Sequence, residues 1–309
     1  MKNFYTDSSF LSYDLQNKYK EFSFASMDEK GKNTSFEMTA FENAYLVGLL
    51  KKYKPAKILE VGLAAGATTR MLVDFVSEQE DCTLFSCDLN EYYYRDQSKK
   101  TAYLALDQYV PPANETDSDK KKWHLLTGKY LPQYLDYIGG GIDFCILDTV
   151  HSLPGELLDF ISVMPFLKEG AVVVLHDVNM PLIWKDMPRR HAHSNKVILD
   201  SVVGEKIICK DPNNFGGISN ISAVVINKDT LKYFNNVFST LSFGWSYLPG
   251  EEEIEIYANH YEKFYGASAA EHLRNIYIMQ KEMLKNDEYT ESSKKPKKSF
   301  MDKIKNIFK

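Results

Sequence analysis

Short apolar segments alternate with helical patterns between residues 57 and 175 of the chain. The segments occupy residues 57–62, 83–88, 123–126, 142–148 and 171–175. Among the helical patterns between them are Thr68–Ser77 and Gly155–Leu167. Strands that are apolar on both faces and alternate with helices are typical of a parallel sheet covered on both sides. The sequence therefore predicts an α/β fold of the Rossmann-like, doubly wound type, with a mostly parallel sheet and helices on both faces.

Helical patterns also flank this predicted sheet. Thr34-Ser35-Phe36-Glu37 resembles a capping box, and the apolar residues after it recur at helical spacing until Pro55. Two further strands fit residues 206–210 and 221–226, and the Tyr-rich stretch from Thr230 to Asn286 is mostly helical in pattern. We therefore expect four parts, which are an N-terminal helical cap, a central sheet domain, a C-terminal helical extension and a tail, at residues 1–55, 56–228, 229–290 and 291–309.

Composition excludes several classes of protein. The 309 residues carry a formal net charge of −5, which argues against a dedicated nucleic-acid binder. No apolar run approaches the roughly 20 residues that span a bilayer, and the N-terminus has no apolar signal segment. The four cysteines form no CxxC pair, as expected for a reduced, cytoplasmic protein.

A small-residue loop follows the first predicted strand and precedes a helix. Within Glu60–Thr69, the residues Gly62, Ala64 and Gly66 allow a ligand to approach the backbone closely, beside unpaired N–H groups at the helix N-terminus. The spacing is GxxxG and not the GxGxxG that admits a pyrophosphate. A ligand without phosphates fits better, and a nicotinamide-dependent oxidoreductase is disfavoured.

Asp88 ends the second predicted strand, 26 residues beyond Gly62. A carboxylate at this position can accept hydrogen bonds from both hydroxyls of a ribose. The alternative is that Asp88 only caps the helix that follows. A nucleoside without pyrophosphate, bound at the carboxyl ends of parallel strands, is what S-adenosylmethionine presents.

Two further motifs complete the pattern, Asp148-Thr149-Val150-His151 and the segment Leu167–Gly170 followed by His176-Asp177-Val178. With the glycine loop and Asp88, they resemble class I S-adenosylmethionine-dependent methyltransferases. Within this class the sequence is most similar to O-methyltransferases of the catechol and macrocin type and to cephalosporin-hydroxylase-like proteins. The resemblance covers Lys57–Lys228 and makes residues 56–228 the cofactor-binding methyltransferase domain, whereas the C-terminal third has no such resemblance.

The resemblance implies roles for individual residues toward the cofactor. Asp88 would hold the ribose, Gly128 would contact the adenine, and Asp148 would lie near the amino group. The residues that would surround the methionine part are Glu60, Gly62, Ala64, Gly66, Thr68 and Thr69.

Catalytic roles follow from the same resemblance. His151 matches a general base of sugar-modifying members, and its intrinsic pKa suits that role. Asp148, His176 and Asp177 match metal-ligand positions, with Asp148 also able to orient His151. His176 replaces an oxygen ligand, which disfavours Mg²⁺ and favours a softer divalent metal or no metal. Alternatively, His151 is a loop histidine bonded to backbone and His176 a partly buried histidine at a strand end.

We therefore predict an S-adenosylmethionine-dependent O-methyltransferase that acts on a small-molecule or sugar/glycan hydroxyl. A catalytically silent protein that keeps the cofactor pocket is the alternative. The basic stretch with Arg189, Arg190, His191 and His193 fits either a lid for an anionic substrate or a solvated loop. The tyrosines of the C-terminal part fit either helix packing or a sugar-binding surface.

The tail differs in charge from the rest of the chain. Ser293–Lys309 carries seven Lys and one Asp, which leaves the remainder strongly acidic. Its apolar residues fall on one helical face, a pattern typical of a basic amphipathic helix on an anionic membrane. The alternative is a solvated terminus. If the tail forms the amphipathic helix, we expect peripheral contact with the inner face of the membrane.

Overall fold

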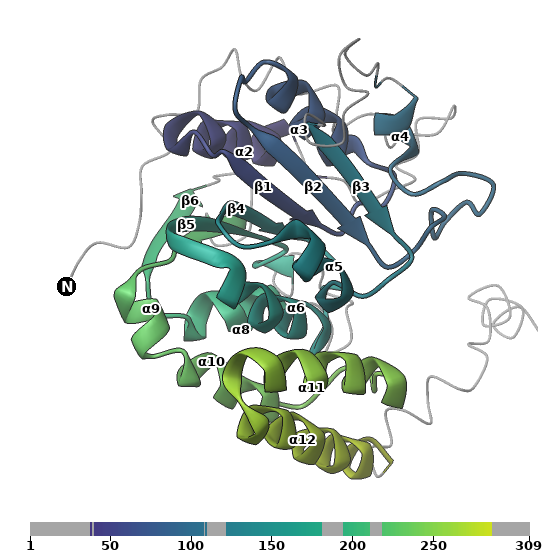
Figure 1. Cartoon of the computed structure of the whole chain (residues 1–309), viewed down its shortest axis with the longest axis vertical. Helices are drawn as coiled ribbons and strands as arrows, with labels where there is room; N and C mark the ends of the chain where they lie inside the picture. Colours follow the sequence, from purple (N-terminus) through teal and green to yellow (C-terminus); the bar gives the residue numbers. More distant parts are fainter. Residues whose placement is uncertain are drawn as a thin grey trace, which may run out of the picture.

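The computed structural model describes Met38, residues 40–107, Tyr109, and residues 122–180, 194–210 and 218–285. Its centre is a seven-stranded sheet with the order β3-β2-β1-β4-β5-β7-β6 (Figure 1). Strands β1 to β5 pair in parallel, and β7 runs antiparallel to both β5 and β6. The strands are β1 Lys57–Val61, β2 Thr83–Asp88, β3 Trp123–Thr127, β4 Ile142–Leu147, β5 Leu167–His176, β6 Glu205–Lys210 and β7 Ile218–Val225. This arrangement confirms the predicted mostly parallel α/β sheet.

Helices cover both faces of the sheet (Figure 1). One face carries α2 (Ala40–Tyr53), α3 (Ala67–Ser77) and the short α4 (Tyr103–Leu106), and the other carries α5 (Pro132–Ile138), α6 (Gly155–Val163) and α8 (Ser194–Ser201). Successive strand residues point to opposite faces. In β1, Ile58 joins the core under α2 and α3, whereas Leu59 joins the core under α6. The central strands therefore require apolar side chains at nearly every position.

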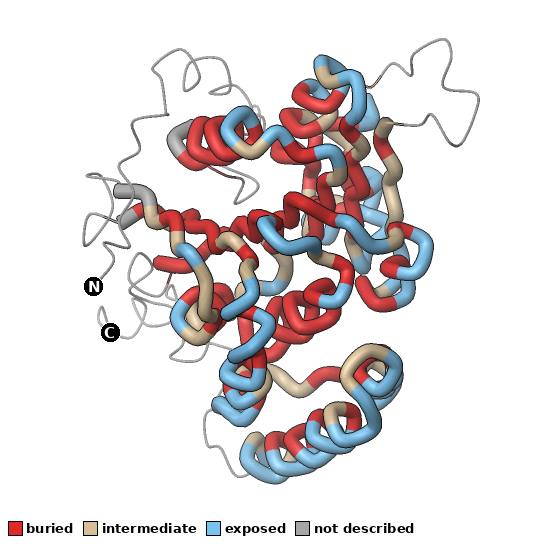
Figure 2. Tube along the Cα trace, turned by 60° about the vertical axis from the view of Figure 1, so that its left-hand side comes forward, coloured by how far each residue is buried: buried red, intermediate tan, exposed pale blue. Residues whose placement is uncertain are grey.

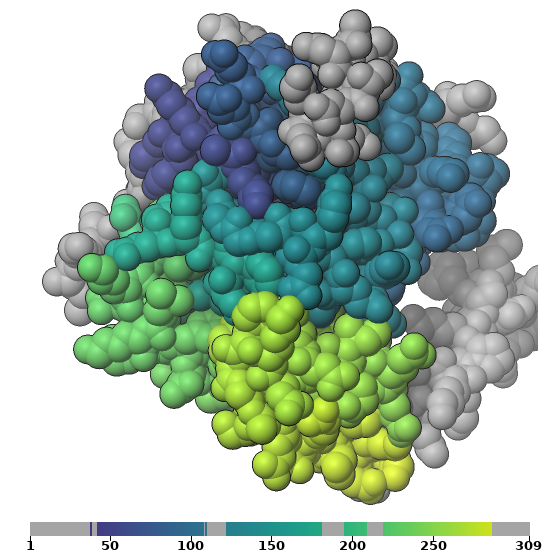
Figure 3. Space-filling model, viewed as in Figure 1, coloured from purple at the N-terminus to yellow at the C-terminus, as the bar shows by residue number. Residues whose placement is uncertain are grey.

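The C-terminal part is helical and packs against α5 and α6 (Figures 1 and 3). It contains α9 Lys228–Lys232, α10 Asn235–Ser239, the 3₁₀ turn η4 Thr240–Ser242, α11 Glu251–Tyr265 and α12 Ala267–Lys285. Figure 2 shows α11 and α12 with a buried face toward the domain and an exposed face toward solvent. Tyr261 donates a hydrogen bond to the carbonyl of Leu158 (3.0 Å), and Tyr265 donates to that of Ile161 (2.6 Å). The extension thus shares one apolar core with the sheet domain.

Several boundaries differ from the expectation. The helix predicted over Gly155–Leu167 ends at Val163 and continues as the 3₁₀ turn η2 (Met164–Phe166), where Pro165 has no N–H to extend an α-helix. Helices α5 and α8 are too short to give a clear apolar period in the sequence. The 34–37 capping box, the basic residues 189–193 and the tail all lie outside the described residues. The four domain boundaries stay a prediction.

Candidate functional site

A cavity of about 530 Å³ lies at the carboxyl ends of β1, β2 and β4. Its volume falls within the range of small-molecule pockets, and its place at the strand ends is where open α/β sheets bind ligands. Three short segments that follow strands contribute Gly62–Ala64, Asp88–Asn90 and Asp148–His151 to its wall. Lys129–Leu131, after β3, and residues of the C-terminal extension complete it. Four strand ends and a separate helical segment therefore share one cavity.

The loop after β1 depends on Gly62. Its φ is +90°, and a Cβ there would lie 1.9 Å from the carbonyl oxygen of Asp148. The ends of β1 and β4 are held this close because Asp148 N donates to the carbonyl of Val61 (3.0 Å). Gly62 N also donates to the carbonyl of Cys87 at the end of β2 (2.9 Å). Gly66, also at φ +90°, caps the N-terminus of α3. No other residue fits position 62 without moving the end of β4.

Glu60 and Thr69 lie beneath this loop and do not line the cavity. The buried Glu60 carboxylate accepts hydrogen bonds from Thr69 Oγ1 (3.1 Å) and Ser86 Oγ (2.7 Å). It thereby ties β1 to α3 and β2. Gly62, Ala64 and Thr68 line the cavity themselves.

Asp88 faces the cavity as the sequence predicts. Its Oδ2 accepts from Leu63 N (2.9 Å), and its Oδ1 accepts from Asn90 N (2.8 Å). Each carboxylate oxygen keeps a lone pair, so the group can still accept two hydroxyl hydrogens. Asp88 caps no helix, because the next helix, α4, begins at Tyr103. Gly128 lies behind it, with its N–H on the Asp88 carbonyl (3.1 Å), and does not line the cavity.

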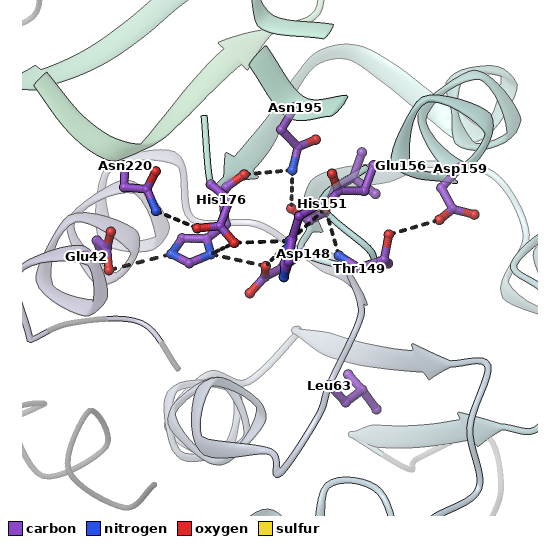
Figure 4. Close-up of polar contacts among 12 residues, drawn as sticks. Glu42, Leu63, Asp148, Thr149, His151, Glu156, Asp159, His176, Asn195 and Asn220 are labelled. Atoms are coloured by element: carbon purple, nitrogen blue, oxygen red, sulfur yellow. Dashed lines mark hydrogen bonds and ion pairs between the residues drawn. The ribbon is translucent and has the colours of Figure 1, made fainter. Parts of the chain in front are cut away.

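Carboxylates and histidines gather where β4 and β5 end (Figure 4). Asp148 Oδ1 lies 3.1 Å from His176 Nδ1 and 3.6 Å from His151 Nδ1. Asp177 Oδ2 lies 3.0 Å from His151 Nδ1 and 3.4 Å from His176 Nδ1. Glu156 Oε1, at the start of α6, is 3.5 Å from His151 Nδ1. The predicted residues Asp148, His151, His176 and Asp177 therefore form one cluster, which we call the acid–histidine cluster together with Glu156.

Residues that the sequence analysis did not single out hold this cluster in place. Asn195 of α8 donates to the backbone carbonyls of His176 (2.7 Å) and Leu147 (3.3 Å). The Asn220 side chain on β7 donates to Asp177 Oδ1 (2.5 Å). On the far side, Glu42 Oε2 of α2 lies 3.6 Å from His176 Nε2. These contacts join segments far apart in sequence, so no local motif announces them.

The electrostatics of the cluster favour charged histidines. Burial disfavours the imidazolium, yet Asp177, Glu156 and Asp148 outweigh it and raise the pKa of His151 to about 9. Burial likewise opposes the charge on His176, and the carboxylates of Asp148, Asp177 and Glu42 raise its pKa well above the ordinary value. For Asp177, burial is outweighed by the two histidines, which lower its pKa to about 2. The cluster therefore places two imidazolium groups among carboxylates.

Two residues of the cluster have unusual backbone conformations. His151 has φ +54° and Asp177 has φ +59°, in the left-handed region that non-glycine residues seldom occupy. Such conformations cost about 1–3 kcal/mol each and concentrate at functional sites. Both conformations bring their side chains within 3.0 Å of each other.

Among the described residues, Asp148, His151 and Asp177 form a group whose ligand atoms lie within 4.8 Å of one another. His151 Nδ1 is buried without an aligned hydrogen-bond partner. An N,O,O donor set with an unsatisfied nitrogen fits a mid-series divalent ion such as Mn²⁺, Fe²⁺ or Zn²⁺. The sequence predicts His176 as the nitrogen ligand, and in the structure His176 lies beside this group on the buried side.

The C-terminal extension supplies cavity residues that lie outside the resemblance. Tyr247, Glu253 and Tyr257 line it. Tyr257 is buried and donates to Asp159 Oδ1 (2.7 Å), and burial raises the pKa of Asp159 to about 7. The tyrosines therefore serve helix packing, and Tyr247 and Tyr257 also face the cavity. In the sequence, these tyrosines are marked only by the high tyrosine content of the C-terminal part. That content does not distinguish tyrosines that pack helices from tyrosines that line the cavity.

Comparisons with known proteins find one matching family model and a number of similar solved structures. Residues 59–178 match a family model described as a methyltransferase domain. No curated protein matches the chain. Among solved structures, the O-methyltransferase TomG of Streptomyces achromogenes, involved in tomaymycin synthesis and solved with S-adenosylmethionine, is 15% identical, covers 70% of this chain and 91% of its own, and has a TM-score of 0.46. An O-methyltransferase of Bacillus cereus with S-adenosylhomocysteine is 13% identical, with coverages of 69% and 91% and a TM-score of 0.44.

The matched residues run from β1 to just past β5 and contain the glycine loop, Asp88 and all five residues of the acid–histidine cluster. From β1 to β5, residues 59–178 are therefore similar to a methyltransferase domain.

Proposed function

We propose that the chain is an S-adenosylmethionine-dependent O-methyltransferase that methylates a hydroxyl of a small molecule or of a glycan. One observation supports this most directly. The glycine loop, the ribose-binding candidate Asp88 and the candidate base His151 all line the same cavity. Methyl transfer requires the acceptor oxygen about 3–3.5 Å from the methyl carbon, in line with the breaking C–S bond. Because the candidate nucleoside site and the candidate base share one cavity, an acceptor hydroxyl beside the base would lie close to the cofactor's methyl group.

In this proposal the cofactor lies along the strand ends. Gly62, Ala64 and Thr68 surround its methionine part, Asp88 accepts from the ribose hydroxyls, and Asp148 accepts from its amino group. The buried Glu60 and Thr69, with Gly66 and Gly128, shape the loops that these residues occupy. Glu60, Thr69, Gly66 and Gly128 therefore act on the cofactor only through the backbone of these loops.

His151 accepts the acceptor's proton only as a neutral imidazole. Its pKa of about 9 means that without a ligand it is mostly protonated at neutral pH. A cation bound in the cavity lowers this pKa because like charges repel. The cofactor's sulfonium is such a cation, so cofactor binding and formation of the base are coupled in this proposal.

The acid–histidine cluster has the donors for a divalent metal. Asp148, Asp177 and either His151 or His176 would hold it. A metal bound there would lower the pKa of an acceptor hydroxyl. Asn220 would keep the Asp177 carboxylate oriented toward such a metal.

Calorimetry with a nucleoside ligand and with a dinucleotide tests the cofactor assignment. We expect the chain to bind S-adenosylhomocysteine and not NAD, because the GxxxG loop has no middle glycine to admit a pyrophosphate. Binding of NAD alone would overturn the proposal. Transfer of labelled methyl groups to a panel of phenolic and sugar acceptors then separates an active enzyme from a silent cofactor-binding protein, which would bind S-adenosylhomocysteine and label nothing.

No helix among the residues that the structure describes is long and apolar enough to cross a bilayer. From its basic amphipathic pattern, we propose that the tail, Ser293–Lys309, contacts an anionic membrane surface. The full chain is expected to sediment with vesicles that contain phosphatidylserine, and a chain without Ser293–Lys309 is expected to stay in the supernatant with unchanged S-adenosylhomocysteine affinity. Equal sedimentation of the two chains would contradict this role.

A further inference from the structure

Exposed apolar side chains gather near the C-terminal end of the extension. Met279 (40% exposed) and Met283 (44%) are four residues apart on α12 and therefore lie on the same side of this helix. Ile278 (59%) adjoins them, and Phe243 (52%) directly follows η4. Phe243 lies beside this part of α12, because its carbonyl accepts a hydrogen bond from Gln280 Nε2 (2.7 Å). We call Phe243, Ile278, Met279 and Met283 the α12 apolar strip.

The charged groups beside the α12 apolar strip are paired with one another. Glu282 Oε1, next to Met283, lies 2.7 Å from Lys285 Nζ. Lys281 Nζ lies 2.7 Å from Glu251 Oε1, in the first turn of α11. Both pairs are neutral, so this end of α12 does not repel an anionic surface. Exposed apolar side chains that lie together in this way are typical of an interaction site.

The tail is joined to this end of α12 by a short connection. Helix α12 ends at Lys285, and the basic tail begins at Ser293. Even a fully extended chain between these two residues spans at most about 30 Å. When the lysines of the tail bind an anionic bilayer, the C-terminal end of α12 is therefore held within this distance of the bilayer surface.

We propose that the α12 apolar strip inserts into the surface of an anionic membrane beside the tail, so that the strip and the tail form one docking surface. The inference rests on the membrane contact proposed for the tail and does not depend on the cofactor assignment. The seven lysines of the tail supply an electrostatic attraction that acts within a Debye length. The strip supplies apolar area that leaves water, and the two contributions together bind a bilayer more stably than either alone.

The proposed docking surface lies beside the cavity without blocking it. Glu253, in the same turn of α11 as the ion-paired Glu251, lines the cavity. At 3.6 residues per turn, Met279 and Met283 lie on the side of α12 away from Lys281 and hence away from α11. Helix α12 therefore lies between the bilayer and α11. The cavity wall at Glu253 is held about 10–20 Å, or one to two helix diameters, from the membrane.

Sedimentation with vesicles of phosphatidylcholine and phosphatidylserine tests the docking surface. The full chain with Met279→Gln and Met283→Gln combined is expected to lose about tenfold or more in vesicle affinity, because two apolar side chains no longer leave water. Leu231→Gln is the matched control. Leu231 is 57% exposed on α9, which lies far from the end of α12 in Figure 1, and this variant is expected to keep the wild-type affinity. Circular dichroism verifies that each variant is folded.

The outcomes separate the strip from the tail. If the wild-type chain does not sediment with these vesicles, the membrane role of the tail fails and this inference fails with it. If the wild type and the double methionine variant sediment equally, only the inference is overturned, and the tail alone contacts the membrane. A second copy of the chain is the other candidate occupant. A wild type that is dimeric in the absence of vesicles, with a monomeric double variant, would overturn the inference in favour of an interface between copies.

Discussion

Gly62→Ala is expected to lower the free energy of unfolding by about 3–5 kcal/mol. It is also expected to weaken binding of S-adenosylhomocysteine by about tenfold or more. The added Cβ would lie 1.9 Å from the carbonyl oxygen of Asp148, which is backbone and cannot rotate away. The end of β4 must therefore shift, and Asp148 and His151 shift with it. Denaturant unfolding and calorimetry measure the two effects.

Gly170→Ala is the matched control for this substitution. Gly170 has nearly the same backbone conformation, φ +87°, but no atom within 4 Å of the position of a Cβ. The Gly170→Ala variant therefore measures the loss in free energy of unfolding that comes from the left-handed conformation alone, about 1–2 kcal/mol. Equal losses of stability in the two variants would show that close approach of β1 and β4 does not constrain position 62.

His151→Asn is expected to reduce kcat by about 10²–10⁴-fold, the usual contribution of a general base. Asparagine tolerates the left-handed backbone of residue 151 and can donate to the Asp177 carboxylate, but it cannot take a proton. Affinity for S-adenosylhomocysteine is expected to stay within about threefold, because His151 is assigned to the acceptor side. Single-turnover transfer of a labelled methyl group measures the chemical step.

His272→Ala is the control for the loss of an imidazole. His272 is exposed on α12, on the outer side of the extension. Its removal is expected to leave kcat unchanged. If His151→Asn also retains wild-type kcat, His151 is not the base, and the acid–histidine cluster then activates the acceptor without it.

Much of the fold follows from local sequence patterns. The sequence predicts all seven strands, although β5 and β7 begin four and three residues earlier than expected. The central strands are visible because a strand covered on both faces must be apolar at consecutive positions. Helices α5 and α8 are not predicted, since seven or eight residues contain too few turns for a period to show.

Some residues of the candidate site are likewise marked by a local sequence pattern, and others are not. Gly62 and Asp88 are visible because a strand followed by a small-residue loop, and an acid at the end of the next strand, are local signals. Asn195, Asn220 and Glu253 are not visible, because each reaches the site from a segment with no motif of its own.

The sequence by itself determined the parallel sheet, the tight loop after β1 and the residues that end strands β2, β4 and β5. These depend on apolar periodicity and on backbone conformations that few residue types can adopt. Only the tertiary structure decided that Asp177 lies between two histidines and that α11 borders the cavity at Glu253. Such contacts depend on how the chain crosses over between strands and on how the extension packs on α5 and α6, and neither leaves a short-range signal in the sequence.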